Sequence, residues 1–409
     1  MRIVYLHQYF RTPAMAGGTR SYEFARRLVA SGHEVHVVTS DVDTVDVRRH
    51  DWRTTIEAGA TVHWAAVPYH GSMSYRSRIR SFFQFAQVAA VRAARIDQDV
   101  VLATSTPLTI AIPAIYSARR RRVPMVLEIR DVWPEVPIAL GALRSPLSRY
   151  AAQRLERFAY QNARQVIALS PGMADSIRRR FPKVPVTVVP NACDRSLFAT
   201  AEAAGARLRA ELAWLGDRPL VLYAGTLGYV NHVEYLVRVA AAARKLWPAL
   251  RFAVIGDGPE KAHVRSVASE LGVLGQNFVM FDPLPKSDVV AFFGASTLAI
   301  STVRDEPVLH ANSANKVFDT WAAGRPVAIN HEGWIADTIR ESGAGVVLPA
   351  TDHDQAARML VAFVTDPARV SAARQAAQTV AQTRFDRDLL FQRFEQTLWE
   401  AVGTTTRPS

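Results

Sequence analysis

The run Asn312-Ser313-Ala314-Asn315-Lys316-Val317-Phe318-Asp319 combines residue types that can bind an anion and a sugar hydroxyl. Ser313 is a common helix N-cap, so the run predicts a helix over residues 314–323. Free amides at a helix start, together with the Lys316 ammonium, attract a diphosphate. Asp319 lies on the same helix face as Lys316, where its carboxylate can bind the two hydroxyls of a ribose. The alternative is a surface ion pair between Lys316 and Asp319.

Three glycine segments are candidates for close backbone contact with a ligand. Gly225-Thr226-Leu227-Gly228 follows a strand expected at 220–224, and Gly256-Asp257-Gly258-Pro259-Glu260 follows a strand at 252–255. Gly17-Gly18 stands between the first expected strand and the first helix, where a plain turn is the alternative. The chain has no GxGxxG pattern at these places, which argues against a dinucleotide-dependent dehydrogenase.

The segment Glu128-Ile129-Arg130-Asp131-Val132-Trp133-Pro134-Glu135 begins in an apolar strand and ends in a charged turn. Arg130 can neutralise phosphate, and Asp131 or Glu135 can accept a hydrogen bond from an acceptor hydroxyl. The alternative is an Arg–Asp pair that only stabilises the strand end.

Residues 76–95 mix arginines with apolar side chains, and the formal charge of the whole chain is +12. On a helix this mixture gives an apolar face edged by cations, which suits an anionic membrane surface. The residues expected at the membrane are Arg76, Arg78, Arg80, Phe82 and Phe83. An ordinary core helix with solvated arginines is the alternative.

The elements that must position these residues alternate between strands and helices along the chain. In the first half we expect strands at 3–9, 34–39, 61–67, 100–104, 125–129, 165–169 and 186–189, with helices that include 19–30 and 146–160. In the second half we expect strands at 220–224, 252–255, 278–281, 298–301, 327–330 and 345–348, with helices at 233–246, from 260, and at 314–323. Such alternation predicts two α/β domains with parallel sheets, whose ligands bind beyond the carboxyl ends of the strands.

The expected domains are 1–190 and 191–385, joined by an irregular, alanine-rich linker that continues to Gly205. A helix over 386–402 is expected to return to the first domain, and 403–409 is expected to be a disordered tail. The 409 residues exceed what one hydrophobic core usually covers, which also favours two domains.

Composition limits the other classes of function. The single cysteine, Cys193, excludes an internal disulfide and is expected in the core of a cytoplasmic protein. The histidines lack metal-ligand spacing, and we expect Asp41-Val42-Asp43 to be a chance pattern rather than a metal site. The N-terminus is expected to be a strand, not a signal peptide, and no apolar run is long enough for a membrane-spanning helix.

In order and spacing, these motifs resemble those of retaining glycosyltransferase family 4. That family has the GT-B fold, in which two Rossmann-like domains face each other across a cleft. The chain is most similar to the branch that makes O-antigen, capsule and exopolysaccharide, such as the N-acetylfucosamine transferases. The segments that carry the resemblance also include Pro190-Asn191-Ala192-Cys193-Asp194, Tyr223-Ala224-Gly225-Thr226 and Ala322-Ala323-Gly324-Arg325-Pro326.

The resemblance implies that the second domain binds a nucleotide sugar, with UDP as the expected nucleotide, and that no metal or other cofactor is needed. Asp319 would bind the ribose, Lys316, Ser313 and the Gly17-Gly18 amides the diphosphate, and the backbone near Phe281 the base. The expected donor-binding residues are Gly17, Gly18, Gly225, Thr226, Gly228, Gly258, Phe281, Asn312, Ser313, Asn315, Lys316 and Asp319. In such enzymes a donor phosphate oxygen takes the acceptor proton, so no enzyme nucleophile is expected.

The chain departs from the family pattern at three places. Ala311 stands where many members have a glutamate eight residues before the ribose-binding acid, and Glu306 is the nearest preceding acid. Arg130 stands where many members have a histidine. The usual Arg and Lys after the first strand of the second domain are replaced by Thr226, Asn231 and His232. The residues expected to be catalytic are Asp131, Arg130 and Glu306, and Trp133 and Glu135 are expected to bind the acceptor.

Three hypotheses about function are compatible with the sequence. The first is transfer of a hexose or N-acetylhexosamine to a polyprenyl-diphosphate-linked saccharide at the inner face of the membrane. The second is transfer to a soluble natural-product acceptor. The third is a non-catalytic protein that binds nucleotide sugars or nucleic acid, although no nucleic-acid-binding pattern is present and no specific nucleic acid is expected.

Overall fold

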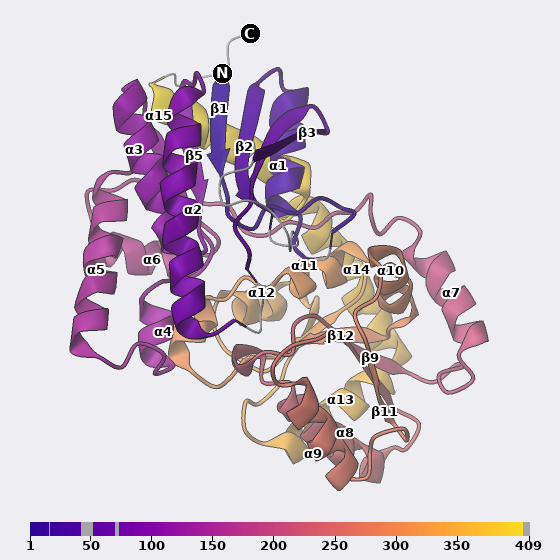
Figure 1. Ribbon diagram of the computed structural model, residues 1–409. Helices are drawn as coiled ribbons and strands as arrows, with labels where there is room; N and C mark the ends of the chain where they lie inside the picture. Colours follow the sequence, from indigo (N-terminus) through magenta and orange to yellow (C-terminus); the bar gives the residue numbers. More distant parts are fainter. Residues whose placement is uncertain (16, 42–51, 70–72, 404–409) are drawn as a thin grey trace. The chain divides into compact units, whose positions relative to one another are not determined.

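The structure is a computed structural model that describes residues 1–15, 17–41, 52–69 and 73–403 (Figure 1). Contacts divide the chain into two compact units, which are Met1–Pro190 with the chain from Leu390 on, and Asn191–Leu389. We call them unit 1 and unit 2. Except for Gly403, the tail expected to be disordered lies outside the described residues.

In its described part, unit 1 is built on a sheet with the strand order β3-β4-β2-β1-β5-β6-β7-β8. All neighbouring strands are parallel except the β3–β4 pair. The strands are β1 (Arg2–Leu6), β2 (Glu34–Ser40), β3 (Trp52–Glu57), β4 (Ala60–Ala65), β5 (Val100–Thr104), β6 (Met125–Ile129), β7 (Gln165–Ala168) and β8 (Val186–Val188). Strand β3 was not predicted, because it lies at the sheet edge with half-exposed, largely polar residues and has no apolar run.

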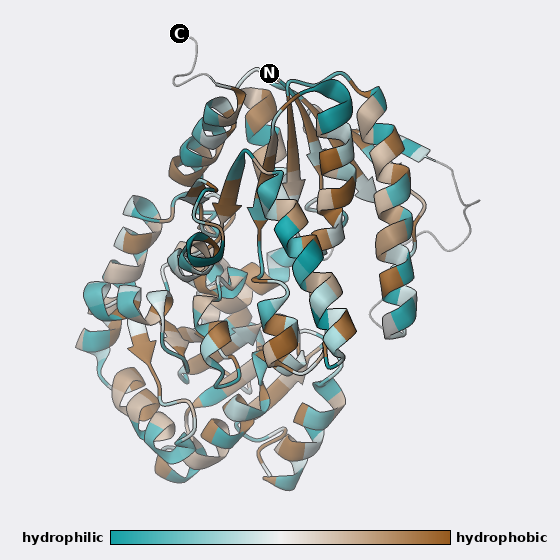
Figure 2. Ribbon diagram, turned by 90° about the vertical axis from the view of Figure 1, so that its left-hand side faces the viewer, coloured by the Kyte–Doolittle hydropathy of each residue, from teal (hydrophilic) through white to brown (hydrophobic). Residues whose placement is uncertain are grey.

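Helices separate the consecutive parallel strands of unit 1, as the alternation predicted, except that strand β3 lies between β2 and β4 in the sequence. They are α1 (Arg20–Ala30), α2 (Tyr75–Arg95), the short η1 (Leu108–Ile110), α3 (Ala111–Arg121), α4 (Glu135–Ala139), α5 (Pro146–Gln161) and α6 (Pro171–Arg180). Figure 2 shows that the strands are largely hydrophobic whereas the helices carry both polar and apolar bands. Helix α6 begins where Ser170 Oγ accepts a hydrogen bond from the amide of Met173, with a proline in its first turn.

The C-terminal helix α15 (Arg387–Val402) contributes its residues from Leu390 on to unit 1. The ring of Phe394 lies 4.3 Å from that of Phe24 on α1. In the same interface, His33 Nε2 and Glu395 Oε1 are 2.8 Å apart, and both side chains are buried. A sequence-remote helix is thus part of the core of unit 1.

Unit 2 is built on a parallel sheet with the order β11-β10-β9-β12-β13-β14. The strands are β9 (Leu220–Ala224), β10 (Arg251–Ile255), β11 (Phe278–Phe281), β12 (Leu298–Ser301), β13 (Val327–Ile329) and β14 (Gly345–Val347). Because β9 and β10 are parallel neighbours, the two glycine loops that follow them leave the same edge of the sheet.

The α-helices of unit 2 are α7 (Ala201–Glu211), α8 (Glu234–Leu246), α9 (Lys261–Glu270), α10 (Lys286–Ala295), α11 (Asn315–Ala322), α12 (Trp334–Ser342), α13 (His353–Val364) and α14 (Pro367–Thr383). Two short 3-10 helices, η2 (Tyr229–Asn231) and η3 (Pro307–Ala311), precede α8 and α11. The expected linker to Gly205 is wrong in part, because α7 begins at Ala201. This helix packs on α10 so closely that a Cβ at Gly205 would lie 2.2 Å from the backbone of Gly294.

Candidate functional site

Two interlocked backbone loops form the edge of the unit 2 sheet where β9 and β10 end. The amide of Gly225 donates to the carbonyl of Ile255 over 2.9 Å, and the amide of Leu227 donates to that of Asp257 over 2.8 Å. The amide of Glu260 donates back to the carbonyl of Leu227 over 2.9 Å. The loops therefore hold each other in one conformation.

Glycine is required at two positions of these loops for packing. Gly256 has φ +147°, and a Cβ there would lie 2.0 Å from the carbonyl oxygen of Gly225. Gly258 has φ +154°, and its Cβ would lie 2.4 Å from the carbonyl oxygen of Leu227. A Cβ at Gly228 would meet nothing closer than 3.5 Å. Contact of these glycines with a donor stays a prediction.

Lys316 lies in the first turn of α11, against the β9 loop. Its Nζ donates to the hydroxyl of Tyr223 over 3.1 Å and lies 4.4 Å from the centre of that ring. The Tyr223 hydroxyl in turn donates to the carbonyl of Thr226 over 2.7 Å. A Cβ at Gly225 would lie 3.0 Å from Cε of Lys316, so the glycine makes room for the lysine.

The ammonium group of Lys316 has no anionic partner among the described residues. Burial lowers the pKa of Lys316 to about 8, because removal from water disfavours the charged form. An uncompensated cation in such a place is stabilised by any anion that binds beside it. This arrangement favours an anionic ligand at the start of α11.

Ser313 is not the N-cap of this helix, contrary to the prediction. The N-cap is Ala314, and no side chain caps the helix start. Ser313 is instead held by Asn191, whose side-chain Nδ2 donates to the Ser313 carbonyl over 2.5 Å. Asn315, the first helical residue, is exposed.

Asp319 pairs with Lys286, the first residue of α10, at 3.1 Å. The surface ion pair between Lys316 and Asp319 is thus not formed. Lys286 was missed by the sequence analysis, because nothing in its neighbourhood indicates a partner 33 residues away. Asp319 is partly buried, with about a fifth of its side chain exposed, so a ligand can reach its carboxylate.

The remaining predicted residues of unit 2 surround this edge. Glu306 lies between β12 and η3, partly buried, and its carboxylate bonds to no described side chain. The carbonyl of Asn312 accepts the Trp334 indole N–H over 2.9 Å. The ring of Phe281 packs on Phe292 at 5.0 Å, at the end of β11.

In unit 1, Arg130 and Asp131 follow β6, and the amide of Arg130 donates to Ser105 Oγ over 3.1 Å. His7, which directly follows β1, was missed by the sequence analysis; its signal is a polar residue at a strand end. It is 2% exposed, and burial, Arg130 and Arg11 hold its pKa well below the ordinary value. A neutral imidazole therefore lies near the Arg130 cation.

Glu135 is bound within unit 1 by α6. Its carboxylate accepts from Ser176 Oγ at 3.0 Å and pairs with Nε of Arg180 at 2.9 Å. Trp133, two residues before it, is partly buried. Their acceptor-binding roles stay predictions, and Glu135 has to exchange these partners to fulfil its role.

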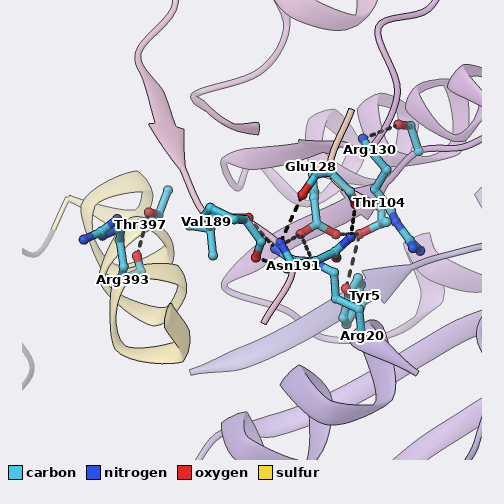
Figure 3. A network of polar contacts seen from close by, with 12 residues as sticks. Tyr5, Arg20, Thr104, Glu128, Arg130, Val189, Asn191, Arg393 and Thr397 are labelled. Atoms are coloured by element: carbon cyan, nitrogen blue, oxygen red, sulfur yellow. Dashed lines mark hydrogen bonds and ion pairs between the residues drawn. The ribbon is translucent and has the colours of Figure 1, made fainter. Parts of the chain in front are cut away.

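Glu128, which opens the same sequence motif, is a core residue. It is fully buried and binds Nε and Nη2 of Arg20 at 2.9 and 2.8 Å (Figure 3). Arg20 also donates to the carbonyl of Val189 over 2.8 Å, and Thr104 donates to Glu128 over 2.8 Å. This network fixes the last segment of unit 1 before Asn191 to the core.

Gly17 and Gly18 are exposed and precede α1, whose start has no side-chain cap. Of the five residues predicted at a membrane, Arg76, Arg80 and Phe83 are exposed on α2. Phe82 instead stacks on Tyr69 at 5.6 Å, and Arg78 donates to the carbonyl of Met73 over 3.0 Å. Of these five residues, Arg76, Arg80 and Phe83 are therefore the ones that a membrane surface can contact.

Among the described residues, no helix is both long and apolar enough to cross a membrane. In the same residues, no three His, Cys, Asp or Glu side chains gather as a metal site. Val42 and Asp43 of the Asp-x-Asp pattern lie outside the described residues, so metal independence stays a prediction.

Two family models match consecutive parts of the chain. Residues 16–192 match the glycosyl transferase 4-like domain, and residues 206–380 match the glycosyl transferases group 1 domain. Solved structures with the same fold include sucrose-phosphate synthase from Thermosynechococcus elongatus, with a TM-score of 0.77, 16% identity and coverage of 98% of this chain and 99% of that chain. Anabaena HepE in complex with UDP and glucose has a TM-score of 0.71 and 17% identity, covering 98% of this chain and 100% of that one.

Curated relatives share about a quarter of the aligned residues. The GDP-mannose-dependent alpha-(1-6)-phosphatidylinositol monomannoside mannosyltransferase of Mycolicibacterium smegmatis is 25% identical over 67% of this chain and 69% of its own length. The putative colanic acid biosynthesis glycosyl transferase WcaI of Escherichia coli is 25% identical over 67% of this chain and 71% of its own length. The 2-deoxystreptamine glucosyltransferase of Streptomyces kanamyceticus is 25% identical over 55% of this chain and 57% of its own length. The chain thus spans 57% to 71% of the length of these three relatives.

Proposed function

We propose that this chain, a glycosyltransferase of the GT-B type, transfers a sugar from a nucleoside diphosphate to a saccharide. Its glycosyl transferase 4-like domain precedes its glycosyl transferases group 1 domain. The observation that carries the proposal is Lys316, a partly buried lysine whose ammonium group has no described counterion and lies beside two glycine loops. A diphosphate supplies the missing negative charge.

In the proposed donor site, Asp319 binds the ribose hydroxyls and Lys316 with the start of α11 binds the diphosphate. We propose UDP as the nucleotide; the UDP bound in Anabaena HepE supports this choice, whereas the Mycolicibacterium relative is named for GDP-mannose. The transferred sugar is a hexose or N-acetylhexosamine.

The proposed reaction retains the configuration of the anomeric carbon and needs no metal. The bond from that carbon to the diphosphate breaks, and its bond to the acceptor oxygen forms on the same face. The acceptor proton passes to a donor phosphate oxygen, so UDP leaves with it. Lys316 stabilises the charge on the leaving diphosphate, while Arg130, Asp131 and Glu306 position the reacting groups.

We propose a polyprenyl-diphosphate-linked saccharide at an anionic membrane surface as the acceptor, as part of cell-surface polysaccharide synthesis. Support comes from the names of WcaI and the Mycolicibacterium relative, and from α2. Helix α2 contains no acidic residue and exposes Arg76, Arg80 and Phe83. A basic helix with exposed aromatic groups suits an anionic bilayer.

A soluble acceptor is the second candidate, because two relatives are named as transferases of 2-deoxystreptamine and a third as an alpha-D-kanosaminyltransferase. Flotation with vesicles that contain anionic lipid separates the two candidates. The first candidate requires the wild-type chain to float and an Arg76→Gln, Arg80→Gln double variant to float less. A wild-type chain that stays at the bottom in low salt favours the soluble acceptor.

The donor proposal is tested by thermal unfolding with UDP, GDP, ADP and TDP, with and without EDTA. A ligand that binds only the folded state raises the melting temperature by mass action. We expect the largest rise with UDP, the same rise in EDTA, and a smaller rise in Asp319→Asn. A rise that disappears in EDTA contradicts metal independence, and a larger rise with another nucleotide contradicts the choice of UDP.

A further inference from the structure

A cavity of about 370 Å³ lies in unit 1 between the C-terminal ends of α3 and α5 and the start of β6. Met125, the first residue of β6, lines it, whereas Arg130 follows the last residue of that strand. Five strand residues at about 3.3 Å each separate the two ends by roughly 16 Å. The cavity therefore lies at the amino-terminal end of strand β6, whereas Arg130 and Asp131 follow its carboxyl-terminal end.

Three arginines and no acidic residue line this cavity. The guanidinium of Arg119 donates to Asn162 Oδ1 over 2.6 Å. Arg122 and Arg164 also line it, and neither forms an ion pair or a side-chain hydrogen bond with a described residue. Two helix C-termini contribute about half a negative charge each, so three guanidiniums leave a net charge of about +2. The electrostatics favour an anion.

The backbone of Arg122 is in the left-handed conformation, with φ 57° and ψ 43°, at the C-cap of α3. Glycine is the residue that occupies this conformation without strain, and it is usual where a helix ends this way. Non-glycine residues in such conformations tend to cluster at functional sites. Here the strain places a third cation at the cavity.

The cavity is apolar where it is not cationic. Ile115 and Met125 line it and are buried, with 3% and 2% exposure. Beside it, Tyr116 on α3 and Phe158 on α5 are exposed, and the guanidinium of Arg119 lies 5.9 Å from the Phe158 ring. Helices α3 and α5 contain one acidic residue, Glu156, which is buried and bound to Arg180. Such surroundings suit an anion attached to an apolar group.

We propose that this cavity binds a phosphate ester, in the form of the headgroup phosphate of an anionic lipid. It is a second site, and the inference does not depend on the sugar-transfer reaction. The guanidiniums of Arg119, Arg122 and Arg164 surround the phosphate, while Tyr116 and Phe158 contact the apolar part of the lipid. A free phosphorylated metabolite offers the same phosphate without the apolar part.

The test measures binding of dihexanoyl phosphatidic acid, below its micelle concentration, to the full chain by calorimetry. Arg122→Gln and Arg164→Gln are each expected to weaken binding tenfold or more, because each removes a charge-assisted contact. Arg120→Gln is the matched control: it has the same charge change at the same helix end but does not line the cavity, and it is expected to change affinity less than twofold. Arg122→Gly removes the cation and relieves the backbone strain, so it is expected to weaken binding while its melting temperature stays at or above that of the wild type.

Binding of glycerol 3-phosphate and of dihexanoyl phosphatidylcholine is measured for comparison. If both bind more weakly than phosphatidic acid, the result supports an anionic lipid as the ligand. Glycerol 3-phosphate bound as tightly as phosphatidic acid supports a phosphate site but overturns the lipid assignment. An Arg120→Gln variant that weakens binding as much as Arg122→Gln, or a wild-type chain that binds no phosphate probe, overturns the site.

Discussion

Lys316 is the residue on which the proposed donor site depends most. Its ammonium group lies over the Tyr223 ring, and no described carboxylate neutralises it. Partial burial lowers the pKa of this group to about 8, because removal from water disfavours the charged form. A diphosphate bound beside it would supply the opposite charge.

The lowered pKa of Lys316 predicts proton uptake on binding of a nucleoside diphosphate. Near pH 8 about half of the molecules lack this proton, and the diphosphate favours the charged form. Calorimetry of UDP binding at pH 8, in buffers of different ionisation enthalpy, should show uptake of about half a proton. Affinity should fall as the pH rises through 8.

Two lysine variants test whether Lys316 takes up the proton in that calorimetric experiment. Lys316→Met should bind UDP at least tenfold more weakly and lose the proton uptake, whereas Lys245→Met, an exposed lysine of unit 2, should match the wild type. Proton uptake that persists in Lys316→Met contradicts the assignment of the proton to Lys316.

In the free protein, the free energy of unfolding should rise between about pH 8 and the ordinary lysine pKa of 10.5, because the unfolded chain binds more protons than the folded chain in this range.

Asp319 predicts discrimination between ribose and deoxyribose. If its carboxylate accepts hydrogen bonds from the ribose hydroxyls, the wild type should bind UDP about tenfold or more tightly than 2′-deoxy-UDP. Asp319→Asn keeps the shape and loses the charge, so the preference should shrink. The same preference in both proteins would show that Asp319 serves only the ion pair with Lys286, and Lys286→Met separates that structural role.

The sequence indicated which residues belong to the site but not which residues they contact. Lys316 and Asp319 were placed on one helix because they are three residues apart, but they do not pair with each other. Tyr223 and Asn191 were missed as partners, since they contact Lys316 and Ser313 across 93 and 122 residues of sequence. Pair partners such as Lys286 depend on packing that local spacing does not encode.

Among the elements, the interlocked loops after β9 and β10 predict a contrast between two glycines. Gly256→Ala forces a Cβ to within 2.0 Å of the Gly225 carbonyl and should destabilise the chain by about 2 kcal/mol or more. Gly228→Ala has open space and φ −107°, so its effect should stay within about 0.5 kcal/mol. Urea unfolding compares the two, and equal midpoints would show that the loops are not locked.

Elements were predictable where apolar runs alternate with helical periodicity. The buried strands β5 and β6 were found at their observed residues, because four of the five residues in each are apolar. Strand β3 has alternating polar residues at a sheet edge, and α7 is rich in alanine. Alanine favours a helix, but α7 has Gly205 in its middle and lacks a regular apolar face, so the sequence analysis read it as a linker.

For the whole molecule, the confirmed prediction is the fold, two Rossmann-like domains of the GT-B type. That fold is shared with sucrose-phosphate synthase and HepE at 16% and 17% identity, so it says little about the donor sugar or acceptor. Specificity depends on a few hydrogen bonds to hydroxyl groups, and no sequence motif of this chain identifies them. The function must therefore be tested on the intact chain.

The most direct test of the account is transfer of a radiolabelled sugar from UDP-sugars to bacterial polyprenyl-diphosphate-linked saccharides, by the wild type and Lys316→Met in EDTA. The account predicts labelled lipid and an equal amount of UDP with the wild type, and at least a hundredfold slower transfer with Lys316→Met, since a charged transition-state contact is lost. The account is contradicted if Lys316→Met transfers label as fast as the wild type, or if the wild type binds UDP but labels neither lipid-linked nor soluble saccharides.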